Sequence, residues 1–223
     1  MIIDPHTHSN EISLCSRISL NDIVDVKKQA GYGGIVITNH CQPWYYVQNE
    51  HAEFMKKFVN VYKDGKKYAD TVGFKVMLGI EVSINDPLYT DWLIYGLSEK
   101  DLLSSPCLYM LNQKELFEFC ESCGAILVQA HPFRGEMRPL DPEYMRGVEV
   151  NCQPNDLKRK DDVIAFAKQN GLLLTSGVDY HGREMTMFCG MEVPDDTETS
   201  ADFAKCLKEG KAKLFIDGKV LEI

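Results

Sequence analysis

Five of the six histidines in this chain lie beside or just past short apolar runs, and an acidic residue closes another such run. Buried imidazoles and carboxylates are costly to desolvate unless they are hydrogen-bonded or coordinated, and a divalent cation compensates several of them at once. The pattern therefore predicts a metal site. The residues concerned are His6, His8, His40, His131 and His181, together with Glu81, which follows the apolar run over residues 76–80.

Spacing within this set supports the prediction. His6 and His8 are two residues apart, and so are Asp179 and His181. Residues two apart in a strand point to the same side, so each pair presents two side chains to one cation. The remaining candidates each follow a separate apolar run, and a closed or curved parallel sheet would bring all of them to its C-terminal rim.

The elements that would position these residues are strand–helix units around a parallel sheet, because short apolar runs alternate with longer amphipathic stretches. We expect strands near 2–5, 34–38, 74–82, 91–96, 125–130, 147–151 and 172–178. Helices are expected over 20–30, 50–69, 112–123, 155–170 and 200–210, a loop bordering the site over 131–146, and a hairpin of 213–216 with 220–223.

Bulk properties limit the class of protein. A chain of 223 residues with 44% hydrophobic residues is sized for one domain over 1–223, with 183–223 packing on it as an extension. The net charge of −9 argues against a nucleic-acid or membrane partner. No signal peptide precedes residue 4 and no apolar run approaches the roughly 20 residues that span a bilayer, which predicts a cytoplasmic location. Oligomeric state stays open.

Six segments together resemble the motifs of the PHP (polymerase and histidinol phosphatase) family, in order and spacing, over residues 2–182. They are Asp4-Pro5-His6-Thr7-His8, Thr38-Asn39-His40, Gly79-Ile80-Glu81, Ala130-His131-Pro132-Phe133-Arg134, Gly147-Val148-Glu149-Val150 and Gly177-Val178-Asp179-Tyr180-His181-Gly182. The resemblance implies an α/β fold, a distorted seven-stranded β/α barrel. It also implies that the C-terminal rim of this barrel holds two or three divalent metal ions and that the protein hydrolyses phosphate esters.

The resemblance also implies a division of ligands. His6, His8, Glu81 and Asp179 would surround one metal, Glu81 would bridge to a second that also uses His131, and His40 and His181 would serve a third. The chain departs from the family in three places: Cys15, with Glu11 nearby, stands where His or Asp is usual, residues 94–98 lack a usual histidine, and Asn39 replaces an Asp. Two metals and three are therefore both open, as are Zn, Mn and Fe.

These residues lead to the hypothesis of a metal-dependent phosphatase in which metal-activated hydroxide attacks phosphorus. The predicted catalytic residues are Glu81, His131, Asp179 and Arg134, and the predicted substrate-binding residues are Arg134, Arg183 and Arg17. The expected substrate is a small phosphorylated metabolite such as histidinol phosphate or a nucleotide. Two alternatives are a catalytically reduced metal-binding or regulatory module, and a protein-tyrosine phosphatase.

Neighbouring residues receive simpler interpretations. His51 begins a Lys-rich helical stretch and is predicted to be a solvated surface histidine. Residues 44–46, Trp-Tyr-Tyr, either line a substrate pocket or pack a loop. Glu149 and Asn151 are expected to hydrogen-bond the ligands rather than coordinate. Cys15 is either a thiolate ligand or a small apolar residue.

Overall fold

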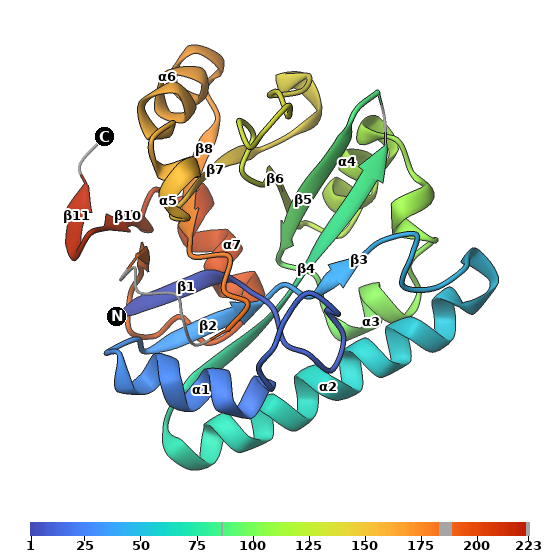
Figure 1. Ribbon diagram of the computed structural model, residues 1–223, viewed down its shortest axis with the longest axis vertical. Coiled ribbons are helices and arrows are strands. Elements are labelled where there is room, and N and C mark those ends of the chain that lie inside the picture. The colour runs from blue at the N-terminus through green and yellow to red at the C-terminus, as the bar shows by residue number, and fades with distance from the viewer. Residues whose placement is uncertain (86, 183–188, 222–223) are drawn as a thin grey trace.

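The sheet of this protein is one curved, mixed sheet, seen in a computed structural model that describes residues 1–85, 87–182 and 189–221 (Figure 1). Its strand order is β11-β10-β9-β1-β2-β4-β5-β6-β7-β8, with β3 paired to β4. The strands are β1 (Ile2–Thr7), β2 (Gly34–Ile37), β3 (His40–Cys41), β4 (Lys75–Asn85), β5 (Tyr89–Tyr95), β6 (Ile126–Gln129), β7 (Gly147–Asn151), β8 (Leu173–Gly177), β9 (Gly190–Glu192), β10 (Lys213–Ile216) and β11 (Lys219–Leu221).

Helices lie along the outside of this sheet, and α1 packs beside α2 against β2 and β4 (Figure 1). They are α1 (Leu20–Gln29), α2 (His51–Val72), α3 (Glu99–Leu103), α4 (Gln113–Ser122), α5 (Pro154–Leu157), α6 (Lys160–Asn170) and α7 (Ser200–Lys208), with single 3-10 turns η1 (Gln48–Glu50), η2 (Leu108–Met110) and η3 (Pro142–Tyr144). Side-chain caps explain several starts: Ser19, Asn112 and Thr199 each accept a backbone hydrogen bond from the first turn that follows.

The seven expected strands and the five expected helical regions all form near their expected bounds, but the sheet differs from a seven-stranded parallel barrel. It has 11 strands within the described residues, and β5 runs antiparallel to both β4 and β6. The reason is the connection. A parallel crossover needs a dozen or more residues, whereas Asn85 pairs with Tyr89 almost immediately after β4 ends.

The rim of the sheet is joined where β1 and the segment after β8 meet. Tyr180 N donates to His6 O at 3.0 Å, and His8 N donates to Tyr180 O at 2.9 Å. The buried Asp4 side chain ties the same two segments, because its Oδ1 accepts from Val178 N at 3.0 Å. The first and the last of the predicted ligand pairs are therefore held side by side by backbone geometry.

Gly177, the last residue of β8, lies at the tightest point of this junction. A Cβ atom at position 177 would lie 2.5 Å from His6 Cβ and 2.8 Å from Glu149 Oε1. These distances are shorter than real Cβ contacts, so only glycine allows β8 to approach β1 this closely.

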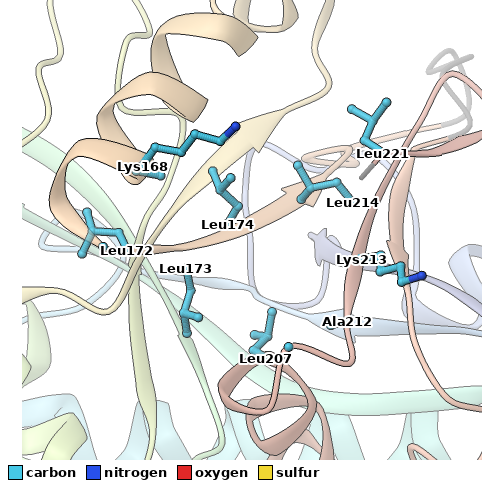
Figure 2. Close-up of a pocket in the computed structure, with 12 residues that line it drawn as sticks. Lys168, Leu172, Leu173, Leu174, Leu207, Ala212, Lys213, Leu214 and Leu221 are labelled. Carbon is cyan, nitrogen blue, oxygen red and sulfur yellow. The ribbon is translucent and has the colours of Figure 1, made fainter. Parts of the chain in front are cut away.

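Residues 190–221 extend the sheet beyond β1. β9 pairs antiparallel with β1, β10 with β9, and β11 with β10, which confirms the expected terminal hairpin as far as residue 221. A cavity of about 510 Å³ lies between these strands, α6 and β8, and its leucine-rich lining contains none of the predicted site residues (Figure 2). In the described ranges, no helix is long and apolar enough to cross a membrane.

Candidate metal centre

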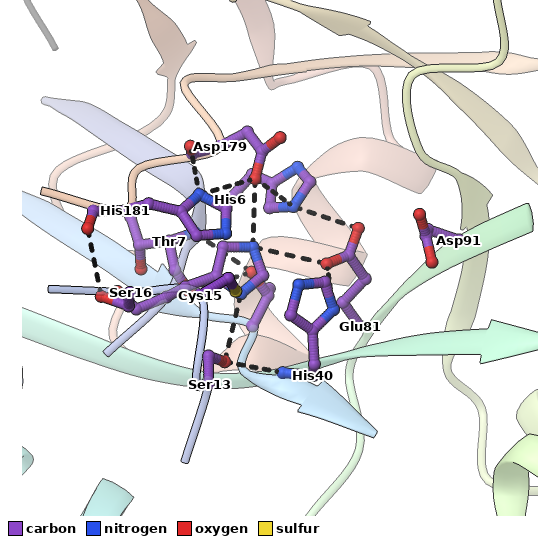
Figure 3. A network of polar contacts seen from close by, with 12 residues as sticks. His6, Thr7, Ser13, Cys15, Ser16, His40, Glu81, Asp91, Asp179 and His181 are labelled. Carbon is purple, nitrogen blue, oxygen red and sulfur yellow. Dashed lines mark hydrogen bonds and ion pairs between the residues drawn. The ribbon is translucent and has the colours of Figure 1, made fainter. Parts of the chain in front are cut away.

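Glu81, on β4, lies at the centre of a cluster of imidazoles at the sheet rim (Figure 3). Its Oε1 is 3.3 Å from His6 Nε2 and 3.4 Å from His131 Nε2. Its Oε2 is 3.4 Å from His8 Nε2 and 2.9 Å from His40 Nδ1. One carboxylate thus faces four histidines from three separate parts of the sequence, as a bridging ligand would.

Asp179 completes the cluster from the segment after β8. Its Oδ1 lies 3.4 Å from His6 Nε2, 3.2 Å from His8 Nε2 and 3.3 Å from His181 Nδ1. All seven side chains that the sequence nominated as ligands are therefore brought together at one place.

The chemistry of these atoms fits a divalent metal. Within the described residues, His6 Nε2, His8 Nε2, His40 Nδ1 and both Glu81 oxygens are buried and make no hydrogen bond. Buried polar atoms are rarely left without partners, and a cation facing them supplies what is missing. Three groups have donor atoms close enough to share an ion: His6 with His8 and Glu81, His8 with His40 and His181, and Glu81 with Asp91 and His131.

Burial and neighbouring charges set the ionisation of the carboxylates. Burial alone would raise the pKa of Glu81, but the imidazoles of His40 and His6 hold that pKa well below its usual value. Burial would likewise raise the pKa of Asp179, and His6, His8 and Arg134 hold it well below. Both groups are therefore carboxylates, the form that binds metal.

The two first histidines respond in opposite ways. Burial lowers the pKa of His8 well below its usual value, and the nearby rings of His181 and His40 lower it further. Burial also lowers the pKa of His6, but Glu149, Asp179 and Glu81 reverse this and raise it well above normal. The neutral His8 ring is ready to coordinate, while the surroundings of His6 favour positive charge.

Glu149, on β7, orients the ligands, as predicted. Its Oε1 lies 2.7 Å from His6 Nδ1, which leaves Nε2 of that ring to face Glu81. Its Oε2 accepts from His131 N at 3.2 Å and from Asn151 Nδ2 at 3.0 Å. A carboxylate on the far nitrogen of a histidine ligand fixes the ring and raises its basicity.

The backbone at two of the seven residues is in the left-handed region. His131 has φ 29° and Asp179 has φ 55°, although neither is glycine. Such conformations are unfavourable for residues with a Cβ and persist where the surrounding structure imposes them, often at functional sites. The surrounding structure therefore imposes an unfavourable backbone conformation at His131 and Asp179, and this conformation directs both side chains toward the cluster.

Asp91, on β5, belongs to the cluster and was not predicted. It is buried, and its Oδ2 lies 3.8 Å from His131 Nε2. The family resemblance placed the usual histidine at residues 94–98, where a parallel strand would end at the rim. Because β5 is antiparallel, its start lies at the rim instead, and Asp91 lies close to Glu81 and His131. The small number of residues before Tyr89 could have indicated this strand direction.

Comparisons with known proteins agree with the geometry. No protein-family model matches the chain, and no curated protein matches its sequence. A solved structure covers the whole chain: a two-domain protein from Bacteroides vulgatus containing a predicted PHP-like metal-dependent phosphoesterase, with TM-score 0.70 and 16% identity. This chain has the fold of PHP-like phosphoesterases. It spans 66% of that two-domain protein.

Two further structural neighbours show the breadth of the fold. A metal-dependent phosphoesterase from Bifidobacterium adolescentis matches with TM-score 0.56 and 14% identity over 82% of this chain and 90% of that one. The lesion-specific endonuclease EndoQ from Pyrococcus furiosus matches with TM-score 0.61 and 16% identity over 96% of this chain and 57% of that one. At these identities the likeness establishes the fold, and the resemblance seen in the sequence is confirmed at that level.

The predicted substrate-binding arginines lie differently on this PHP-like fold. Arg134 borders a cavity of about 520 Å³ together with Asp179 and His181. Arg17 is exposed, and its backbone N–H donates to His181 O at 2.9 Å, so it also lies beside the cluster. Arg183 is outside the described residues.

The aromatic residues after His40 divide between the two interpretations left open for them. Tyr45 meets the His40 ring edge-on, with the ring centroids 6.1 Å apart, so it borders the cluster. Trp44 is exposed and stacks on Tyr89. Tyr46 is buried and stacks on Phe54, where it packs the loop.

The prediction for His51 is wrong. The residue is buried rather than solvated, with Nδ1 2.9 Å from Tyr46 Oη and Nε2 3.0 Å from Ser105 Oγ. The Lys-rich composition of α2 concealed this, because one face of the helix packs inward while its lysines lie outward.

Of the two loop residues considered as extra ligands, only Cys15 lies at the cluster. Glu11 accepts a hydrogen bond from Leu20 N at 3.0 Å and is engaged at the start of α1. The thiol of Cys15 lies within hydrogen-bonding reach of His181 and His40; burial would raise its pKa, but these rings lower it to about 6.

Proposed function

We propose that this protein is a metal-dependent hydrolase of phosphate monoesters acting on a small phosphorylated metabolite, with two or three divalent ions held by the seven clustered residues and Asp91. The observation that carries the proposal is Glu81: a fully buried carboxylate facing four imidazoles, with both oxygens lacking hydrogen bonds among the described residues. A carboxylate in that position suits a pair of cations of the kind that serves phosphoryl transfer.

When bound, divalent metals lower the pKa of water and neutralise charge on phosphoryl oxygens. The chain supplies the rest. Glu81 and Asp179 hold negative charge where the cations are needed, and Glu149 keeps the His6 ring in one orientation. His131 is fixed through its backbone by the same Glu149 carboxylate.

Arg134 is the proposed phosphate-binding residue. Its Nη2 lies 2.6 Å from Asp156 Oδ2 and 2.8 Å from Asp179 Oδ2, with Nε 2.8 Å from the same Asp156 oxygen. These contacts hold a guanidinium fork at the cavity beside the cluster, where it matches two phosphate oxygens. Because Arg134 is paired with Asp156 and Asp179, the bound cations would supply most of the attraction for an anion in this acidic protein, and Arg134 would supply hydrogen bonds. Arg17 and Arg183 are proposed as additional contacts.

The alternative of a catalytically reduced metal-binding or regulatory module is weakened by Asp91. That alternative was motivated by ligand positions that the sequence leaves vacant. Asp91 places an oxygen donor near Glu81 and His131, so one of these positions is filled. Protein phosphotyrosine is the alternative substrate, and the net charge of −9 disfavours nucleic acid.

The test is a turnover screen with the metal-depleted protein and with protein loaded with Zn, Mn or Fe. The substrates are histidinol phosphate, nucleoside monophosphates, a phosphotyrosine peptide, a phosphodiester and single-stranded DNA. We expect metal-dependent turnover that is fastest on a small monoester. Preferred cleavage of DNA would replace the proposal with a nuclease, and bound metal without turnover of any substrate would favour the regulatory module.

Arg134→Ala provides the residue-level test. Loss of a charge-assisted contact of about 1.5–3 kcal/mol should raise KM by about 10- to 100-fold. Arg134→Lys keeps the charge without the fork and should fall between. Arg146→Ala is the matched control, because Arg146 is exposed and pairs with Glu121. Unchanged kinetics in Arg134→Ala would remove this residue from the substrate site.

A further inference from the structure

Cys15 stands in the loop between β1 and α1, at one end of the ligand cluster. Its thiol is within hydrogen-bonding reach of the imidazoles of His40 and His181. Figure 3 shows Cys15 beside the cluster, on the side of His181 and His40. The residue is exposed, and its sulfur also accepts a hydrogen bond from Tyr45 Oη at 3.7 Å.

His8 lies between the two ends of the cluster, because its Nε2 faces Glu81 and Asp179 while its ring lies against His40 and His181. Its side chain is fully buried, and its Nε2 makes no hydrogen bond within the described residues. Its ring stacks between two others, with centroids 4.4 Å from His40 and 4.3 Å from His181, and each of the three rings has a donor atom within 4.8 Å of the others. Cys15 is not within the same 4.8 Å of all three, but its thiolate would add one sulfur to three nitrogens, and zinc accepts both kinds of donor in four-coordinate sites.

The loop is fixed on both sides of the thiol. Ser16 Oγ donates to His8 O at 2.7 Å, and Arg17 N donates to His181 O at 2.9 Å. On the other side, Ser13 Oγ accepts from His40 N at 3.0 Å. The loop that carries Cys15 is therefore hydrogen-bonded, through the side chains of Ser13 and Ser16 and the backbone of Arg17, to the backbones of the three histidines with which Cys15 would share an ion.

The opposite end of the cluster has different donors. Glu81, Asp91 and His131 offer carboxylate oxygens and one imidazole. Oxygen donors suit Mn and Mg, whereas thiolates select zinc and other softer ions. The two ends thus differ in the metals that they favour.

We propose that Cys15 is a thiolate ligand for a metal held with His8, His40 and His181, and that this end of the centre selects zinc while the Asp91 end accepts a harder ion. The inference rests on the proposed multinuclear centre and specifies which metal one part of it takes. The thiolate is the feature that distinguishes the two ends.

Cobalt spectroscopy tests the ligand directly. Metal-depleted full-length protein is titrated with up to three equivalents of Co²⁺ under reducing, anaerobic conditions. We expect a thiolate-to-cobalt charge-transfer band in the near ultraviolet, lost in Cys15→Ser and retained in Cys123→Ser. Cys123 is a matched control because it is also a free thiol, at the end of α4. A spectrum without the band at every ratio, or a band that persists in Cys15→Ser, overturns the proposal.

Metal competition tests the selectivity. After incubation with equal Zn and Mn, wild-type protein should retain both metals. Cys15→Asp should lower the retained Zn:Mn ratio by about tenfold or more, since even outer-shell partners change metal affinity by about 10- to 100-fold. An unchanged ratio contradicts the assigned selectivity. A thiolate band without phosphomonoester turnover would support the ligand and overturn the proposed function, and turnover without the band would do the reverse.

Discussion

The metal centre and the surroundings of His51 both bury histidine, yet they do so in opposite ways. Both ring nitrogens of His51 lie against neutral hydroxyls, those of Tyr46 and Ser105. At the centre, Nε2 of His6 and of His8 has no hydrogen bond within the described residues and faces carboxylates instead. Burial alone therefore does not distinguish a candidate metal ligand from a structural histidine. The distinguishing feature is a buried ring nitrogen that makes no hydrogen bond and faces a carboxylate.

The pKa shifts of the two sites express the same difference. Burial lowers the pKa of His51, with little to oppose it. Burial also acts to lower the pKa of His6, but three carboxylates overcome it. The surroundings of His51 disfavour a positive charge, whereas the carboxylates around His6 favour one.

Of the substitutions that test this difference between the clustered histidines and His51, Glu81→Gln is expected to have the largest effect. The amide keeps the shape of the side chain but removes the charge that the imidazoles surround, so bound metal should fall and turnover should drop by more than about 100-fold, beyond the loss of an outer-shell partner. Metal content per chain and phosphomonoester turnover measure this. Glu53→Gln, exposed on α2, is the control. Full metal content with normal turnover in Glu81→Gln would falsify the assignment of the centre.

A smaller effect is expected from Asp91→Asn. Loss of the Asp91 carboxylate should lower the metal affinity of the Glu81–His131 end by at least about tenfold while leaving the His40–His181 end occupied. Isothermal titration of the metal-depleted protein with Mn²⁺ measures the change, with the exposed Asp64→Asn as control. Equal affinity in the variant and wild type would make Asp91 a structural carboxylate.

The smallest effect is expected at His51, and it concerns stability rather than metal. His51→Phe leaves the hydroxyls of Tyr46 and Ser105 without their partner and should lower the free energy of unfolding by about 1–3 kcal/mol, with metal content unchanged. Because the folded-state pKa of His51 is lowered, the unfolded chain binds the proton more readily, and stability falls as pH drops below about 6.5.

Urea unfolding of the metal-depleted protein at about pH 7.5 and about pH 5.5 measures both effects. The contribution of His51 to acid destabilisation should be missing in His51→Phe, so the stability difference between wild type and variant should narrow at the lower pH. A difference that widens there would show that the sign is reversed.

The sequence predicted which side chains cluster because each candidate ligand follows an apolar run, and the ends of parallel strands meet at one rim. His6 lies near the end of β1, His40 follows β2 as the first residue of β3, and His131 follows β6. The rule fails at Asp91, since it assumes that the last residue of a strand reaches the rim, and β5 runs the other way. Strand direction depends on the length of a connection as well as on the apolar pattern.

His51 shows a second kind of failure. Charged residues around it indicated a solvated position, yet the inner face of a long amphipathic helix is buried whatever its outer face carries. Whether a buried histidine has hydrogen-bond partners depends on residues far away in sequence, such as Ser105, and no local pattern contains that information.

Gly177 shows that substitutions in this protein are restricted at positions without a reactive side chain as well as at the candidate ligands. The position carries no side chain, yet a single methyl there would meet both the first ligand and the carboxylate that orients it. In a survey of tolerated substitutions, we expect Gly177 to accept as few replacements as the clustered histidines do. A search restricted to reactive residue types would overlook this position. A few such positions can preserve an arrangement of side chains while most of the sequence diverges.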